Sequence, residues 1–129
     1  MSCVDTIALR GLIFYAYHGY YAEERALGNR YGVDIEVRTD LRRAAASDQL
    51  ADTINYETLY AIAQEAVVQP AQLLEHIGER IAKQIFEQFA GALQVKITVR
   101  KYNPPIGGIC RAAEIILQRK RHDYLSGVS

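Results

Sequence analysis

The 129-residue sequence contains no tryptophan, only two cysteines and no long hydrophobic run. Cys3 and Cys110 lack the spacing of metal ligands and are too few for a disulfide framework, so we expect reduced thiols. The longest uncharged apolar stretch spans residues 11–17, far below the roughly 20 residues that a bilayer span requires. Asp5 and Arg10 interrupt the N-terminus, which is therefore not typical of a signal peptide. These absences predict a cytoplasmic protein without a membrane segment.

An excess of charge of either sign is absent as well. The 15 basic and 15 acidic side chains cancel, so no long-range field attracts nucleic acid or an anionic membrane surface. We expect neither as a partner, and any charged ligand has to be held by local contacts. The length suits a single domain, residues 1–129, because no Gly/Ser linker and no internal repeat divides it.

Motifs of several enzyme classes are missing. The sequence has no GxGxxG and no GxxxxGK[ST], so no nucleotide cradle is visible. It has no GxSxG, and neither cysteine has a histidine at a meaningful spacing. His18, His76 and His122 are not spaced with carboxylates or cysteines as a zinc site would need. We expect no cofactor and no metal, and the remaining lysine, tyrosine and carboxylate side chains suit proton transfer.

Four segments show the alternation of apolar and polar residues that predicts strands. The first ends in a turn at His18 and Gly19, and the polar connector after it has room for a helical turn. The second is the clearest, because its other face is charged, as expected for an antiparallel sheet with one wet side. The predicted strands span residues 6–17, 31–41, 93–101 and 113–118.

Two segments between these strands carry apolar residues three and four positions apart, which predicts helices. Asn55 can cap the first helix, and Pro70 either stops it or opens the second. In the second helix Glu79 and Lys83 are spaced for an exposed ion pair, and Gly91 ends it. The apolar positions are Leu59, Ile62, Ala63, Ala66 and Val67 in the first helix and Leu74, Ile77, Ile81, Ile85 and Phe89 in the second.

The order strand-strand-helix-helix-strand-strand predicts an α+β fold of two layers, an antiparallel sheet of four strands with two helices on one face. A sheet this small leaves two long edges open. The strand at 31–41 carries little that would blunt an edge, so we expect neighbouring subunits to pair with it. The tail at 121–129 is expected to be frayed.

Lys101 stands where the strand pattern calls for a core residue. Because strand side chains alternate, it follows Leu93, Val95, Ile97 and Val99 on the predicted buried face. The stiff turn at 102–108 then ends the strand and fixes where the lysine points. Burial penalises the charged form of a lysine, which is the profile of a catalytic acid or base. The alternative is that Lys101 simply extends from the strand end into solvent.

Four further polar residues are weaker candidates, and each has a structural alternative. His18 lies at a strand end, where a histidine commonly hydrogen-bonds the turn. Glu24 lies in a charged connector, where a solvated acid is the default, and Tyr56 follows a helix cap and has packing as its alternative. Glu75 lies in the first turn of a predicted helix, where the helix dipole favours an acidic side chain. Glu79 follows four residues later, and two like charges at that spacing repel each other. That spacing suggests that something else holds Glu75.

Four motifs in order along the chain resemble those of the dihydroneopterin aldolases of folate biosynthesis. The resemblance runs from about Asp5 to Lys120, and four motifs at the family's spacing make chance similarity improbable. It departs from the family pattern at Ala16 and Gly78, and the connection around Pro70 is slightly short. The motifs are GLIFYAYHG at 11–19 followed by EER at 23–25 and Gly28, DTINY at 52–56, LLEHIGERIA at 73–82 and KYNPPI at 101–106.

The resemblance implies the tunnelling fold, in which such units join edge to edge in a ring that closes a β-barrel. Family members usually form a tetramer ring stacked into an octamer, with each active site between adjacent subunits. The implied activity is retro-aldol cleavage of 7,8-dihydroneopterin at C1′–C2′, giving 6-hydroxymethyl-7,8-dihydropterin and glycolaldehyde, with epimerase side activity left open. Neither a Schiff base nor zinc is implied, because the conjugated C=N of the dihydropterin accepts the electron pair.

The resemblance also implies roles for residues at matching positions. Lys101 would lie near N5 and donate or relay a proton, and Tyr56 of a neighbouring subunit would protonate the enol-like intermediate. Glu24 would order the water or hydroxyl network. Glu75 would accept hydrogen bonds from the 2-amino and N3–H edge of the pterin. The other implied substrate-binding residues are Leu74, Ile54 and Asn55, the last two through backbone groups. His18 is expected to be structural, near the site.

Two alternatives stay open at this point. One is dihydroneopterin triphosphate 2′-epimerase, which shares the fold and much of the acid-base apparatus. The intact motifs at 17–19 and 104–105 favour the aldolase, and the connector after the first motif offers only Arg25 to bind a phosphate. The other is a non-catalytic pterin-binding ring scaffold, which would have little reason to retain a buried lysine. Tetramer or octamer, stereoisomer preference and a gating role of Tyr20 and Tyr21 are not decided by the sequence.

Overall fold

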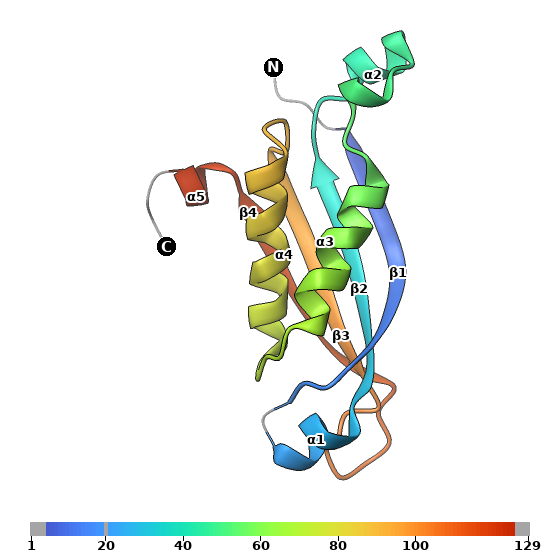
Figure 1. Ribbon diagram of the computed structural model, residues 1–129, viewed down its shortest axis with the longest axis vertical. Coiled ribbons are helices and arrows are strands. Elements are labelled where there is room, and N and C mark those ends of the chain that lie inside the picture. Colours follow the sequence, from blue (N-terminus) through green and yellow to red (C-terminus); the bar gives the residue numbers. More distant parts are fainter. Residues whose placement is uncertain (1–4, 20, 126–129) are drawn as a thin grey trace.

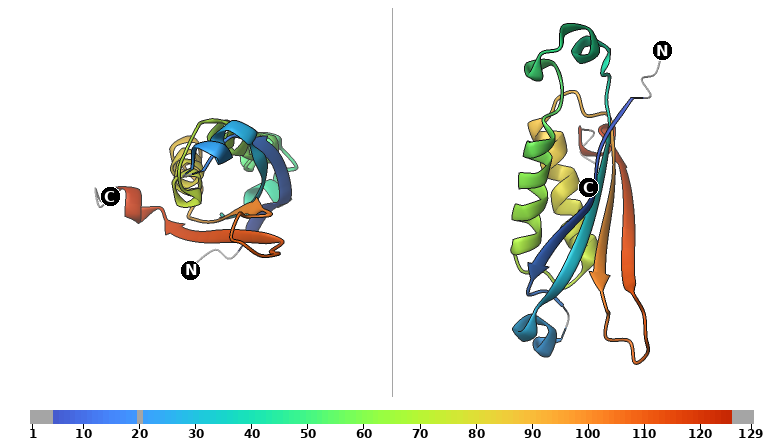
Figure 2. Two further views of the ribbon diagram at one scale, coloured as in Figure 1. Left: turned by 90° about the horizontal axis from the view of Figure 1, so that it is seen from below. Right: turned by 90° about the vertical axis from the view of Figure 1, so that its right-hand side faces the viewer.

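The computed structural model of the chain describes residues 5–19 and 21–125. They form two layers, a four-stranded antiparallel sheet in the order β1-β2-β3-β4 and two long helices, α3 and α4, side by side on one of its faces (Figures 1 and 2). The strands are β1 (Thr6–Ala16), β2 (Asn29–Arg38), β3 (Gln94–Tyr102) and β4 (Ala112–Lys120), and the helices are α1 (Ala22–Leu27), α2 (Arg42–Ser47), the 3-10 turn η1 (Leu50–Asp52), α3 (Tyr56–Val68), α4 (Leu74–Gln88) and α5 (His122–Leu125). The predicted α+β fold is confirmed.

The core lies between the helices and the central strands β2 and β3. In their antiparallel register Val33 is opposite Val99 and Ile35 is opposite Ile97, and these four side chains are fully buried. All four are β-branched, and β-branched side chains pack well on a pleated, half-buried surface. The predicted inward phase of the third strand is therefore confirmed, except that Leu93 precedes β3 and is partly exposed.

Helices α3 and α4 form where the apolar periodicity predicts them, except that α4 ends at Gln88, before Phe89 and Gly91. The Asn55 side chain accepts a hydrogen bond from the backbone N–H of Glu57 at 2.9 Å, which confirms it as the N-cap of α3. Pro70 lies in the connection, two residues after the last residue of α3. The buried residues are Leu59, Ile62, Ala63, Ala66 and Val67 in α3 and Ile77, Gly78, Ile81, Ala82, Ile85 and Phe86 in α4.

Two expectations about the second strand are wrong. The strand ends at Arg38 rather than Leu41, because the backbone N–H of Leu41 donates to the Asp5 carboxylate at 3.0 Å and the chain turns into α2. The strand also lies in the middle of the sheet, paired on both sides, so it offers no edge to a neighbouring subunit. The two edges are β1 and β4. The sequence analysis did not predict α2 or η1.

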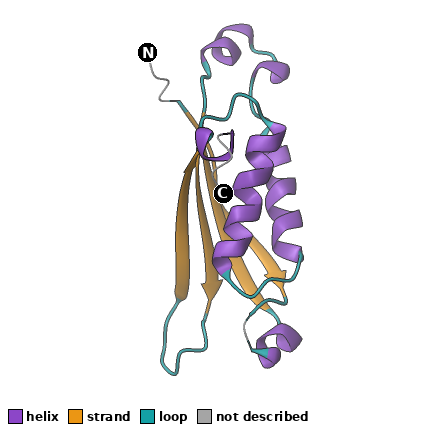
Figure 3. Ribbon diagram, turned by 90° about the vertical axis from the view of Figure 1, so that its left-hand side faces the viewer, coloured by secondary structure: helices purple, strands orange, loops and turns teal. Residues whose placement is uncertain are grey.

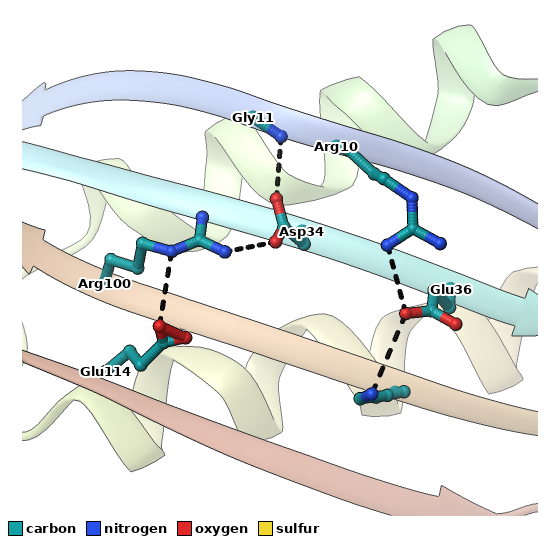
Figure 4. A network of polar contacts seen from close by, with 7 residues as sticks. Arg10, Gly11, Asp34, Glu36, Arg100 and Glu114 are labelled. Carbon is teal, nitrogen blue, oxygen red and sulfur yellow. Dashed lines mark hydrogen bonds and ion pairs between the residues drawn. The ribbon is translucent and has the colours of Figure 1, made fainter.

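A β-bulge bends the edge strand β1. Its register with β2 shifts between Leu9 and Leu12, where Gly11 has φ +74°, a conformation that favours glycine. The freed N–H of Gly11 donates to the Asp34 carboxylate at 2.7 Å (Figure 4). The hydrogen bond from the Arg100 guanidinium, helped by this N–H, holds the pKa of Asp34 below its ordinary value.

The sheet face away from α3 and α4 is polar and carries balanced charge (Figure 4). Arg100 of β3 is also within 3.6 Å of Glu114 on β4, so one network from Gly11 to Glu114 crosses all four strands. A second network joins Arg10 and Lys96 to the Glu36 carboxylate at 3.2 and 4.0 Å. Only the helix-covered face of the sheet is therefore apolar enough to form the core.

The segment after β4 is ordered as far as the structure describes it, so the expectation of a tail frayed from residue 121 is wrong. The Arg121 guanidinium donates to the backbone carbonyls of Phe86, Phe89 and Ala92 at the end of α4. The ring of Tyr124 in α5 packs against Phe86 with centroids 5.0 Å apart. The remaining tail, 126–129, lies outside the described residues.

The expected ion pair between Glu79 and Lys83 is replaced by contacts to the C-terminal segment. The Glu79 carboxylate accepts hydrogen bonds from Arg119 at 3.1 Å and from the Tyr124 hydroxyl. Burial, followed by the bond to Glu79, raises the pKa of Tyr124. Within residues 5–19 and 21–125, no helix combines the length and apolarity needed to cross a membrane.

Candidate active site

Lys101 lies at the end of β3, opposite Tyr31 at the start of β2. Its side chain is only 14% exposed and forms an ion pair with Glu24 of α1, whose side chain is 16% exposed. The lysine therefore does not extend into solvent, and the alternative weighed for it is wrong. A buried ammonium needs a partner of opposite charge, and α1 supplies it.

The Lys101–Glu24 pair borders a pocket of about 420 Å³ that also involves His18, Glu23 and Asn103. Asn103 is the first residue after β3. It has φ +49°, and its N–H donates to the Arg111 carbonyl at 2.9 Å. The left-handed conformation of an asparagine turns the chain away from the sheet just after the lysine. The β3 end is thus a rigid platform for the Lys101 amine.

Gly19 lets α1 approach the strand end closely. With φ +138°, its backbone is in a region that favours glycine, and a Cβ built there would meet the Cβ of Glu24 at 2.6 Å. The Arg25 guanidinium donates to the Gly19 carbonyl at 3.0 Å. The Glu24 N–H donates to the Tyr21 carbonyl at 3.1 Å, and the Glu24 carboxylate accepts a hydrogen bond from the Tyr21 N–H at 3.3 Å. The short helix α1 is therefore fixed by contacts that direct Glu24 toward Lys101.

His18 is buried, 3% exposed, between β1 and the α3–α4 connection. Its Nδ1 accepts a hydrogen bond from the Ala71 N–H at 3.1 Å, so Nε2 carries the proton and donates to the Val67 carbonyl. Burial, together with the nearby Arg80 and Lys101 charges, lowers the pKa of His18. The ring is therefore neutral and holds its two partners in one tautomer.

Tyr31 completes the buried side of this region. Its ring meets the His18 ring edge-on with centroids 5.0 Å apart, and its hydroxyl donates to the His18 carbonyl at 3.3 Å. Burial, followed by the negative charge of Glu24, raises the pKa of Tyr31 to about 12. The hydroxyl is accordingly a neutral donor at physiological pH.

Glu75 and Leu74 begin α4 at this same end of the sheet, near α1 (Figure 1). The Gly19 N–H donates to the Ala71 carbonyl at 3.2 Å, which ties the α3–α4 connection to the β1 end just before α4 starts. Glu75 is exposed, and within the described part of the chain no hydrogen bond or ion pair engages its carboxylate. An acid is favoured there by the helix dipole and remains available to a ligand.

Helix α3 begins at Tyr56, directly after Ile54 and Asn55, and its start lies at the opposite end of the sheet, near α2 (Figures 1 and 3). Ile54 and Tyr56 line a hollow of about 750 Å³ together with Ile7, which pairs with Val37 near the end of β2. Lys101 pairs with Tyr31, which is six positions from Val37 along β2. At the rise of a strand, Lys101 and the hollow beside Tyr56 are therefore about 20 Å apart. Tyr56 is 61% exposed.

Within one chain, the structure therefore divides the candidate site residues into two groups. Lys101, Glu24, Glu75, Leu74 and His18 lie at one end of the sheet, which we call the lysine end, and Ile54, Asn55 and Tyr56 lie at the other, the tyrosine end. Residues 42–51 were not among the predicted elements or motifs, yet Leu50 from this segment lines the hollow beside Tyr56, together with Leu41. In the sequence, this segment shows only a leucine after the polar run at 47–49.

Other residues singled out in the sequence contribute less. Cys110 is a free thiol whose Sγ lies 3.4 Å from the Ala112 carbonyl, and Cys3 and Tyr20 lie outside the described residues. Tyr21 lines the lysine-end pocket. Across residues 5–19 and 21–125, no group of three or more His, Cys, Asp or Glu side chains is placed to hold a metal ion.

The sequence model of the dihydroneopterin aldolase (FolB) family matches residues 7–118. A dihydroneopterin aldolase of Streptococcus pyogenes is 38% identical over 119 residues, which cover 92% of this chain and 100% of the relative. The chain belongs to the dihydroneopterin aldolase family. It is thus a member of a family of lyases, and the resemblance inferred from its motifs is confirmed.

Solved structures of other dihydroneopterin aldolases share the fold. The Escherichia coli structure, in complex with neopterin, superposes with a TM-score of 0.82 at 24% identity, covering 90% of this chain and 99% of that chain. A Burkholderia structure bound to guanine gives a TM-score of 0.73 at 18% identity, covering 90% of each chain. These similarities confirm the strand-strand-helix-helix-strand-strand arrangement of the dihydroneopterin aldolase family.

Proposed function

We propose that this protein is an active dihydroneopterin aldolase, which cleaves 7,8-dihydroneopterin into 6-hydroxymethyl-7,8-dihydropterin and glycolaldehyde in the cytosol. The observation that carries the proposal is the buried Lys101–Glu24 ion pair at the mouth of a pocket, on a chain that belongs to this family. A scaffold that only bound pterins would gain nothing from burying a charged pair at its binding site.

The reaction needs proton transfer but no external electron acceptor. A base removes the proton of the 2′-hydroxyl, the C1′–C2′ bond breaks, and C2′ leaves as the aldehyde carbon of glycolaldehyde. The electron pair of the broken bond moves into the conjugated C=N of the ring, and N5 accepts a hydrogen bond or proton. Protonation of C1′ then yields the hydroxymethyl product. General acid-base groups are sufficient for each of these steps.

We assign the proton at N5 to the Lys101 amine and the ordering of the water or hydroxyl network to Glu24. Lys101 is held at a rigid strand end, which supports a fixed donor position. Glu24 contacts the lysine directly, so it also sets the direction of the ammonium protons. Lysine keeps three donors, and its pairing with one carboxylate leaves others for a substrate or a water molecule.

Glu75 is proposed to bind the pterin through its 2-amino and N3–H edge, with Leu74 beside the ring. Two parallel N–H donors facing one carboxylate make a charge-assisted pair that selects guanine-like edges. The exposed position of Glu75 in the first turn of α4 supports this role. The neopterin and guanine bound to the two solved relatives share that same edge, which agrees with a recognition site of this kind.

Tyr56 is proposed to act from a neighbouring copy, with Ile54 and Asn55 of that copy presenting backbone groups to the pterin. The separation of about 20 Å between the lysine end and the tyrosine end supports this arrangement, because one small substrate does not span it. The open edges β1 and β4 offer pairing groups for a ring of four copies, stacked in an octamer.

The test is to incubate the purified protein with 7,8-dihydroneopterin and measure glycolaldehyde. Lys101→Ala should lower kcat by about a hundredfold or more, as expected for loss of a general acid or base, with the oligomer intact. Glu75→Ala should mainly weaken binding of neopterin. A protein that binds neopterin and releases no glycolaldehyde would contradict the proposal. So would a Lys101→Ala variant that dissociates but keeps its turnover.

A further inference from the structure

His18 occupies a junction between two chain segments that are 49 or more residues apart in sequence. Its ring bonds to the Val67 carbonyl in the last turn of α3 and to the Ala71 N–H in the connection between α3 and α4. The neighbouring Gly19 N–H adds a backbone bond to the Ala71 carbonyl at 3.2 Å. Three hydrogen bonds therefore fasten the α3–α4 connection to the end of β1.

The same junction touches the Lys101–Glu24 pair. The His18 carbonyl accepts from Tyr31, the residue opposite Lys101 in the sheet. On the other side, Glu24 packs so closely over Gly19 that an added Cβ would clash with it. His18 and Gly19 are thus in contact with the elements that carry both members of the ion pair.

On its other flank, the junction fixes the segment that leads into Glu75. The Arg80 guanidinium donates to the carbonyls of Ala66, Gln69 and Pro70 at 2.7 to 2.9 Å. These bonds restrain the connection from the side of α4, and the His18 ring restrains it from the side of β1. Only residues 72 and 73 then separate Ala71 from the first turn of α4.

We propose that His18 is a positioning residue for the pterin: as a neutral Nε2–H imidazole, it sets the distance between the carboxylate of Glu75 and the Lys101–Glu24 pair. This proposal rests on the proposed function and deepens it. The ring nitrogens bond to Val67 and Ala71, so His18 acts through the α3–α4 connection. Binding of the pterin requires the Glu75 carboxylate and the Lys101–Glu24 pair to be held at a fixed spacing.

Protonation of His18 would undo the junction. A charged imidazole has no acceptor for the Ala71 N–H, so that bond would be lost. The groups that face the ring are Arg80 of α4, Lys101 of β3, Tyr31 of β2 and, beyond Tyr31, Glu24 of α1. Because the pKa of His18 is lowered, the folded-state stability it supports is complete above about pH 6.5 and falls as the pH drops toward the folded-state pKa.

The first experiment uses the unmodified protein. The imidazole nitrogens of His18 are followed by NMR against pH, with and without saturating neopterin. We expect the Nε2–H tautomer at neutral pH and a lower titration midpoint when neopterin is bound. Linkage requires this, because a ligand that binds best to the neutral junction must disfavour its protonation. A midpoint that neopterin leaves unchanged would overturn the inference, and no variant has to fold for this result.

The second experiment compares variants at one position. His18→Leu removes both ring hydrogen bonds, whereas His18→Asn keeps an acceptor near Nδ1 for Ala71. We expect His18→Leu to raise the Kd for neopterin and the KM for dihydroneopterin by about tenfold, with kcat within about threefold. His18→Asn should recover part of that loss. His122→Gln, at an exposed histidine far from the junction, is the matched control and should match the unmodified protein.

The outcomes separate the two proposals. If the unmodified protein neither binds neopterin nor releases glycolaldehyde, the proposed function fails and the inference fails with it. If binding and turnover are present but folded His18 variants keep the Kd and KM, only the inference fails. A fall in kcat with an unchanged Kd would likewise overturn it. Faster hydrogen exchange at the Ala71 amide in His18→Leu would support it.

Discussion

The lysine end and the tyrosine end of the sheet are built in opposite ways. At the lysine end, Lys101, Glu24 and His18 are nearly buried, and each bonds to a partner within the chain. At the tyrosine end, Tyr56 and Leu50 are exposed beside a hollow of about 750 Å³. The buried polar groups of the lysine end are thus paired within the chain, whereas the tyrosine end has a hollow with exposed apolar side chains beside it.

This difference indicates where a single chain is complete and where it is not. Buried charges at the lysine end are tolerated because they are paired within the chain. Exposed large apolar side chains around a hollow are typical of a surface that another molecule covers. The proposed function accordingly has the tyrosine end of one copy meet the lysine end of the next, in a head-to-tail contact.

The largest expected effect comes from mixing variants of the two ends. Lys101→Ala and Tyr56→Phe should each have little activity alone, but a ring assembled from equal amounts should recover about one quarter of the unmodified activity. The reason is that half of the chains supply an intact lysine end and half an intact tyrosine end, drawn independently. The measurement is glycolaldehyde release after refolding the two proteins together.

A matched mixture serves as the control for that experiment. Lys101→Ala and Glu75→Ala both alter the lysine end, so no assembled site can contain an intact set from two chains. We expect this mixture to release no more glycolaldehyde than the two variants do when they are measured separately. Equal recovery in both mixtures, or none in either, would show that the two ends do not form one site.

A second prediction compares ion pairs at the two ends. Glu24→Gln leaves the buried Lys101 ammonium facing an amide, and should lower the free energy of unfolding by about 1–3 kcal/mol. Asp40→Asn weakens the exposed Asp40–Arg42 pair at the tyrosine end and keeps an oxygen for the Arg42 N–H. Its free energy of unfolding should be unchanged, because exposed pairs contribute little. Equal losses in the two variants, measured by denaturant unfolding, would contradict the comparison.

The smallest expected effect tests the local structure of the tyrosine end. Asn55→Ala removes the acceptor for the Glu57 N–H and should cost about 1 kcal/mol of stability. Asn55→Asp keeps an acceptor and is the matched control. Thermal unfolding gives the comparison. If both variants unfold at the same temperature as the unmodified protein, the cap does not hold the start of α3, and the position of Tyr56 depends on other contacts.

Much of the fold follows from short-range patterns in the sequence. The alternation of Val95, Ile97 and Val99 predicted both the β3 strand and the inward direction of Lys101, and the structure confirms them. The cap at Asn55 was likewise visible, because an N-cap needs only one side chain and the next two residues. By contrast, α2 buries no side chain, so it leaves no apolar period to detect.

The candidate site was predicted as a set of residues but not as an arrangement. The sequence named Lys101, Glu24, Glu75 and Tyr56, partly through family resemblance. It gave no indication that Glu24 would pair with Lys101 across 77 residues, and only the family resemblance separated Tyr56 from the lysine of its own chain. Which side chains meet depends on strand order and on how loops pack, and neither is encoded in a local period.

The sequence by itself determined the type and order of the main elements, the buried face of β3 and the family. Only the tertiary structure decided that β1 and β4 are the edges, that Glu79 binds Arg119 and Tyr124, and that His18 joins β1 to the α3–α4 connection. The physical reason is one of range. Periodicity and caps act over a few residues, whereas these contacts join segments that only the packed core brings together.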